Sequence, residues 1–172
     1  MFERRLTHCR DCNWTTTSLK SLNLLDNESF FPETIHSFAG HLGHSLVELA
    51  INAEYDDGHD LAPYALPVLA ELTLRTSSCP TRYLQHFRAS PLTTLRLVNC
   101  YLFNTTALQE ILLVKTFPKL EHLDVGTCEF ISIRELGDNF DSLMAACQKA
   151  GLVFKLTPPR TTTVMREGQE DA

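Results

Sequence analysis

The sequence holds one pair of cysteines at a spacing typical of metal and redox sites. Two residues separate Cys9 from Cys12, and His8 directly precedes them. Zinc would need two further ligands at suitable spacing, and the next cysteine, Cys79, is far along the chain. A redox pair is expected in a strand–helix–strand context that the surrounding residues do not show. Three histidines are nearer, but their spacing matches no known zinc finger: His36, His41 and His44. We therefore expect no metal and no cofactor.

His122 and Asp124 are the best candidates for acid–base chemistry, because on a strand both would point to the same side. Such a pair needs a pocket and shifted pKa values, which an open sheet face rarely supplies. The sequence also contains no glycine-rich phosphate loop, no G-x-S-x-G and no H-E-x-x-H motif. We expect no catalytic residues and a protein that is not an enzyme.

A leucine pattern recurs along most of the chain. It reads Leu-x-x-Leu-x-Leu and is followed three residues later by a small polar residue or cysteine. The clearest copy is Leu92, Leu95, Leu97 and then Cys100. Some copies replace a leucine by another residue. The six copies begin at Leu19, Leu46, Leu69, Leu92, Leu120 and Gly151. The intervals between these starts are uneven, at 27, 23, 23, 28 and 31 residues.

This pattern predicts one strand per copy. The second and third leucines are two residues apart, so both point into the core, while the residues between and beside them face outward. One such strand cannot bury its apolar side alone, and neighbouring copies must stack. The chain therefore resembles a leucine-rich-repeat protein. The implied fold is an α/β solenoid, a right-handed β–α superhelix of about six irregular repeats with a parallel concave sheet.

The segments between the strands show helical spacing of apolar residues. Pro32 suits a first helical position, Thr106 and Gln109 form a capping box, and Gly151 suits a C-cap. The stretch from Tyr55 to Pro67 predicts mostly loop, because it is rich in acids and prolines. The expected helices or helical turns lie near residues 32–42, 80–87, 106–112 and 140–151.

Length and composition set the limits of this interpretation. The 172 residues carry a net charge of −6 and 44% hydrophobic residues, which argues against wholesale disorder and against a general nucleic-acid binder. Neither a membrane-spanning stretch nor a secretory signal is visible, so we expect a cytoplasmic or nuclear protein that binds no membrane. We divide the chain into an irregular cap or truncated repeat (1–18), leucine-rich repeats (19–157) and a disordered tail (158–172).

The segment from Pro118 to Val125, PKLEHLDV, and the uneven intervals are similar to the repeats of fungal F-box/LRR-like proteins. So are the cysteines that end two copies, Cys100 and Cys128, which we expect to be buried thiols. In that family the repeats bind a target, and a separate N-terminal F-box docks on a ubiquitin-ligase adaptor. The resemblance brings no catalytic residues. The 18 residues before Leu19 are too few for an F-box, so we expect no binding to a Skp-type adaptor.

The outward rows of the sheet are the predicted functional surface, because solenoids bind partners on the concave side. Arg75 and Arg96 fall in adjacent copies, and arginine is favoured at interface hot spots. The predicted partner-binding residues are Glu71, Arg75, Arg96, His122 and Asp124. We thus expect a module that binds an unknown protein partner, and by resemblance the target-recognition part of an F-box-type ubiquitin ligase adaptor. The alternatives are a solvated face on a nonfunctional repeat fragment, or a small metal- or thiol-dependent enzyme using Cys9, Cys12 and nearby histidines.

Overall fold

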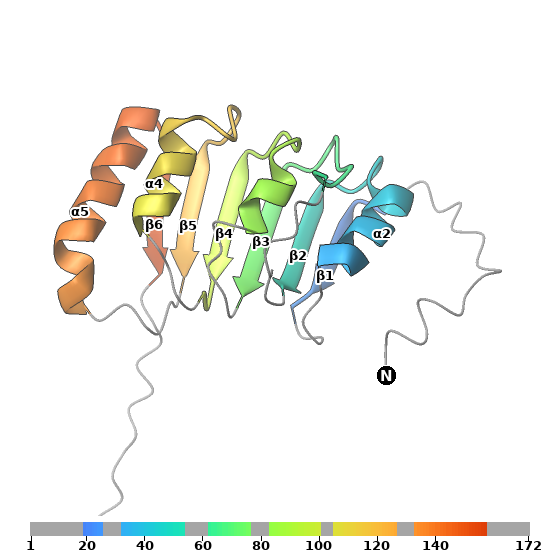
Figure 1. The fold of residues 1–172 in the computed structure, drawn as a ribbon, viewed down its shortest axis with the longest axis horizontal. Helices are drawn as coiled ribbons and strands as arrows, with labels where there is room; N and C mark the ends of the chain where they lie inside the picture. Colours follow the sequence, from blue (N-terminus) through green and yellow to red (C-terminus); the bar gives the residue numbers. More distant parts are fainter. Residues whose placement is uncertain are drawn as a thin grey trace, which may run out of the picture.

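Six parallel strands form one sheet and follow each other in the order of the chain (Figure 1). The strands are β1 (Ser21–Leu24), β2 (Glu48–Ala53), β3 (Glu71–Thr76), β4 (Thr94–Val98), β5 (His122–Gly126) and β6 (Val153–Thr157). The computed structural model describes residues 19–25, 32–53, 62–76, 83–100, 105–126 and 133–157. The predicted N-terminal cap (1–18), with Cys9 and Cys12, and the predicted tail (158–172) lie outside these residues.

The strand register aligns the leucine pattern from one copy to the next. The second positions of the six copies stand opposite each other, at Leu22, Leu49, Leu72, Leu95, Leu123 and Phe154. The third positions do the same, at Leu24, Ile51, Leu74, Leu97, Val125 and Leu156. Burial alternates along the inner strands with a period of two, as in β3, because successive side chains point to opposite faces. The predicted α/β class and parallel sheet are confirmed.

The strands also begin in the same way from copy to copy. The carbonyl oxygen of Lys20 accepts hydrogen bonds from the N–H groups of Val47 (2.8 Å) and Glu48 (2.9 Å). The carbonyl oxygens of Val47, Ala70 and Thr93 each accept two such bonds from the next copy. This ladder satisfies backbone groups that the parallel sheet would otherwise leave unpaired at its edge.

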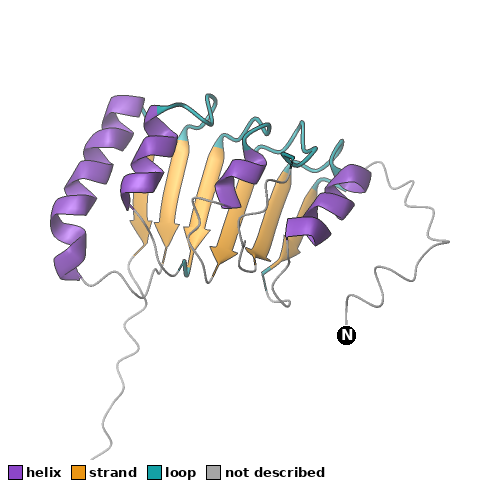
Figure 2. Ribbon diagram, in the orientation of Figure 1, coloured by secondary structure: helices purple, strands orange, loops and turns teal. Residues whose placement is uncertain are grey.

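All helices that the structure describes lie on one face of the sheet (Figure 2). They are α2 (Pro32–Leu42), the 3₁₀ helix η1 (Gln85–Phe87), α4 (Thr105–Leu113) and α5 (Ile133–Ala150). The length of the interval between two copies of the pattern decides which kind of element leads the chain from one strand back to the start of the next. The intervals of 27, 28 and 31 residues hold α2, α4 and α5, whereas the two of 23 residues hold the irregular segment 62–70 and η1. In the described parts of these two short returns, the helix present is η1, with three residues.

Most expectations about the helices are confirmed, but α5 begins at Ile133, well before the expected start near residue 140, and the expected capping box is wrong. Helix α2 begins at Pro32, residues 62–67 form no helix or strand, and Gly151 ends α5 with a φ of 73°. Thr106 is not an N-cap, because α4 already begins at Thr105 and Thr106 lies inside its first turn. An N-cap residue must have non-helical backbone angles, so the predicted capping box does not form.

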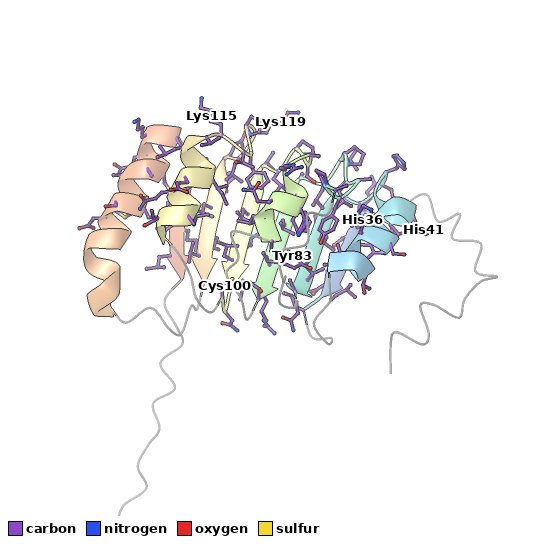
Figure 3. All side chains as sticks on the ribbon, viewed as in Figure 1. His36, His41, Tyr83, Cys100, Lys115 and Lys119 are labelled. Atoms are coloured by element: carbon purple, nitrogen blue, oxygen red, sulfur yellow. The ribbon has the colours of Figure 1, made fainter. Side chains whose placement is uncertain are left out.

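Apolar side chains of the sheet and the return segments make one continuous core. Where the return segments are short, aromatic side chains fill the layer behind the sheet. The Tyr64 ring packs edge-on against the Phe87 ring, with 5.0 Å between the ring centroids, and its centroid lies 5.2 Å from that of the His86 ring. Tyr83 is fully buried beside them (Figure 3). The backbone N–H of Tyr64 also donates to the carbonyl oxygen of His86 (2.8 Å), which ties the two short returns together.

Cys100 is a buried thiol, as expected for a small core residue. Its sulfur lies 3.6 Å from the carbonyl oxygen of Leu74 and 3.7 Å from that of Val98. The thiol thus contacts the backbone where strands β3 and β4 end. Cys128, the corresponding residue of the next copy, lies outside the described residues.

Candidate interaction surface

The face of the sheet opposite the helices, which we call the open face, is covered by no helix or strand of the described chain. Alternate residues of each strand point to it. They are Ser21, Asn23, Glu48, Ala50, Asn52, Glu71, Thr73, Arg75, Thr94, Arg96, Val98, His122, Asp124, Gly126, Val153 and Lys155. All five predicted partner-binding residues lie on this face, because the register fixes which residues point away from the core.

Glu71 and Arg96 form an ion pair between β3 and β4. The guanidinium Nη1 of Arg96 lies 2.9 Å from Oε2 of Glu71, and the two side chains are 44% and 38% exposed. An ion pair this exposed contributes at most about 1 kcal/mol to stability. Its main effect is therefore to hold the Arg96 side chain along the sheet, toward the N-terminal strands.

Arg75 is held separately from this pair. Its Nη1 donates to the carbonyl oxygen of Leu25 (3.3 Å), so the side chain reaches over β2 to the end of β1. In the register Arg96 stands opposite Thr73, and Arg75 stands opposite Val98. The two arginines are diagonal neighbours with different partners, and they do not form one cationic cluster.

His122 and Asp124 lie on β5, in the C-terminal half of the sheet. Asp124 stands opposite Arg96 in the register, but the ion pair described for it is with Lys155, at 3.7 Å between Nζ and Oδ2. His122 is exposed. The predicted site residues therefore fall into two groups, one around Glu71 and Arg96 and one around Asp124.

The open face is hollowed over strands β1 to β4. The hollow has a volume of about 130 Å³ and is lined by Ser21, Leu22, Asn23, Glu48, Leu49, Ala50, Glu71, Thr73 and Arg96. The small side chain of Ala50 leaves the space, and the charged residues form its rim. Small-molecule sites are usually about 300–1,000 Å³. This hollow can accept one side chain of a partner, and it does not reach His122 or Asp124.

Glu48 is the charged residue lining this hollow that the sequence prediction did not select. It stands opposite Glu71 in the register, so two carboxylates lie on neighbouring strands, and Arg96 bonds to the second of them. The sequence signal was present, because both glutamates precede the second leucine of adjacent copies. Which carboxylate the arginine takes depends on side-chain geometry and cannot be read from spacing.

Within the described ranges, no group of three or more histidine, cysteine or acidic side chains is arranged to hold a metal ion. The predicted alternative used Cys9, Cys12 and nearby histidines, and of these Cys9, Cys12 and His8 lie outside those ranges. None of the helices in the described segments is long and apolar enough to cross a membrane.

No protein-family model, curated protein or solved structure matches this chain. Its function must therefore be argued from the sheet and the open face.

Proposed function

We propose that this chain is a leucine-rich-repeat module that binds a protein partner on the open face of its sheet. The observation that carries the proposal is the register, in which six copies of the leucine pattern stand opposite each other in one parallel sheet. Stacked copies with helices behind them are the architecture of leucine-rich-repeat solenoids, whose concave sheets bind partners.

The chemistry of the open face suits a protein better than a small molecule. It combines charged residues of both signs with small polar ones, and its hollow has room for a single side chain. Arg96 is held by Glu71 yet remains 44% exposed, so it can contact a partner without first being ordered. Arginines of this kind are enriched among interface hot spots, and preordering lowers the entropic cost of binding.

The finer proposal is that the module recognises targets as part of an F-box-type ubiquitin ligase adaptor. It is supported only by the resemblance of the leucine pattern and its cysteines to such repeats. Size-exclusion chromatography of the purified chain with a Skp-type adaptor tests the expectation that this chain alone does not bind it. Co-elution would contradict that expectation.

A photo-crosslinking amino acid at Thr73, on the edge of the hollow, can identify the partner in cells. The same amino acid at Gln148, an exposed residue of α5 on the helical side, is the matched control. We expect a protein that is captured from Thr73 and not from Gln148. Capture of the same proteins from both positions would contradict binding at the open face.

The captured protein is then tested in purified form against charge-reversed variants. We expect Arg75→Glu/Arg96→Glu to weaken its binding at least tenfold, with an unfolding transition close to that of the unmodified protein. The control Ser37→Glu/His41→Glu adds two negative charges at exposed positions of α2, outside the open face. Equal affinities for all three proteins would refute the proposal.

A further inference from the structure

Four exposed cations lie on the segments that run from the last turns of η1, α4 and α5 to the starts of strands β4 to β6. We call this group the basic edge: Arg88, Lys115, Lys119 and Lys149. Because the strands are parallel, their first residues lie along the same edge of the sheet, about 4.8 Å apart from strand to strand. Lys115 and Lys119 lie at this edge in Figure 3. The exposed carboxylates next to these cations are Glu121, which directly precedes β5, and Glu110, one turn before Val114 in α4, so the four cations keep a positive balance.

Lys115 occupies a backbone position that favours glycine. Its φ is 54°, and it follows the end of α4. The N–H of Lys115 donates to the carbonyl oxygen of Leu112 (3.1 Å), and that of Thr116 donates to Ile111 (3.2 Å). This is the Schellman motif, in which the left-handed residue is usually glycine.

Helix α5 ends in the same motif with the usual residue. Gly151 has a φ of 73° and donates to Gln148 (3.0 Å), and Leu152 donates to Cys147 (2.9 Å). The chain thus places a lysine in a left-handed conformation where glycine would fit without strain. Lysine is less favourable than glycine in this conformation, and here it adds an exposed charge to the basic edge.

Apolar side chains lie next to these charges. Leu113 and Val114 precede Lys115 and are 50% and 78% exposed. Among the described residues, no exposed large apolar side chain is aromatic. Membrane-surface helices carry Trp, Phe or Leu along one face, whereas the most exposed apolar side chain here is Val114, outside α4, so the basic edge fits a protein surface better than a lipid one.

We propose that the basic edge binds an extended acidic segment of a partner protein. An extended chain advances about 3.3 Å per residue, and alternate side chains point the same way. A segment that alternates acidic and aliphatic residues can therefore bring carboxylates to the lysines and an aliphatic side chain to Val114. This surface is distinct from the open face, and its partner need not be the protein bound there.

Fluorescence anisotropy with a labelled peptide of alternating glutamate and valine tests the proposal on the full chain. We expect saturable binding that weakens as salt is raised, because the contacts are between exposed charges. Arg88→Gln/Lys119→Gln should weaken binding at least tenfold. Lys155→Gln, which removes one exposed cation from the open face, should leave the affinity unchanged. Absence of saturable binding, or equal loss with Lys155→Gln, would overturn the proposal.

Lys115→Gly separates binding from folding at the same residue. It removes the charge and the strain together, so we expect several-fold weaker peptide binding with an unchanged or higher melting temperature. Unchanged affinity would overturn the role of Lys115.

A final measurement uses phosphatidylserine vesicles in co-sedimentation. Vesicle binding that depends on Lys115, without peptide binding, would assign the basic edge to lipid headgroups and overturn the proposal.

Discussion

Cys147 shows how burial sets the chemistry of a single residue. Its side chain lies fully inside the core on α5, and this burial raises the pKa of its thiol from 9.0 to about 11. The thiolate is the nucleophile in cysteine chemistry, so a thiol that stays protonated is unreactive. Cys147 is therefore a core residue and not a candidate nucleophile.

We predict that Cys147 resists alkylation at pH 8 in the folded protein and reacts once the protein is unfolded. The shifted pKa also makes stability depend on pH, because the folded state disfavours the thiolate. The contribution of Cys147 to the free energy of unfolding is fully present below about pH 9 and is lost as the pH rises toward 11. Mass spectrometry of alkylated peptides measures the first effect, and Cys147→Ser is the control for the second. Rapid alkylation of native Cys147 would contradict the prediction.

The two left-handed residues that end α4 and α5 give a matched pair of predictions at one backbone position. Gly151→Ala should lower the free energy of unfolding by about 1 kcal/mol, because alanine is strained at a φ of 73°, although no neighbouring atom would touch its Cβ. Lys115→Gly should raise the free energy of unfolding by up to about 1 kcal/mol, because glycine adopts the left-handed conformation without strain. Denaturant unfolding measures both. If Lys115→Gly destabilised the protein, the strain assigned to Lys115 would be wrong.

The residues of the open face were predictable, but their pairing was not. A period of two along each strand was enough to place Glu71, Arg96 and Asp124 on one face. The sequence could not show that Arg96 bonds to Glu71 rather than to Asp124 opposite it, since both carboxylates are within reach of one guanidinium. Rotamers and local packing decide such contacts, and they leave no periodic trace in the sequence.

At the scale of elements, the strands were easier to predict than the segments between them. Each strand repeats one pattern, whereas each return differs in length and content. Tyr64 and His86 show the difficulty: both are buried behind the sheet, yet the described parts of their returns hold no multi-turn helix. Their positions follow from the space left by short intervals, which depends on the neighbouring copies.

Gly43 provides the prediction for these elements. A Cβ at this position would overlap the carbonyl oxygens of Ala65 and Ala39, because the end of α2 packs directly on the irregular segment 62–70. We expect Gly43→Ala to lower the free energy of unfolding by about 2–3 kcal/mol, since the overlap is with backbone that must shift. Thermal and denaturant unfolding provide the measurement.

Gly40, three residues earlier in α2, is the control. Nothing lies within 4 Å of a Cβ at Gly40, so Gly40→Ala should raise stability by about 0.5–1 kcal/mol through helix propensity alone. Similar effects from the two substitutions would show that α2 does not pack on segment 62–70 in this way.

At the scale of the whole molecule, each strand depends on its neighbours for burial. The third position of the pattern is fully buried in the middle of the sheet, at Leu74 and Leu97, but Leu156 of the last described strand is 45% exposed. The three residues are equivalent in the pattern and differ only in their place in the stack. The sequence gives no sign of this gradient, because burial at the ends depends on what lies beyond them.

Leu97→Ala and Leu156→Ala therefore measure how far the core is shared along the stack. Leu97→Ala should lower the free energy of unfolding by about 2–5 kcal/mol, because it leaves a cavity that surrounding strands and helices cannot fill. Leu156→Ala should cost less than about 1.5 kcal/mol, since part of its side chain is in water already. Denaturant unfolding with a common baseline compares the two. Equal losses would mean that β6 is covered as completely as β4, which would contradict an exposed C-terminal end of the sheet.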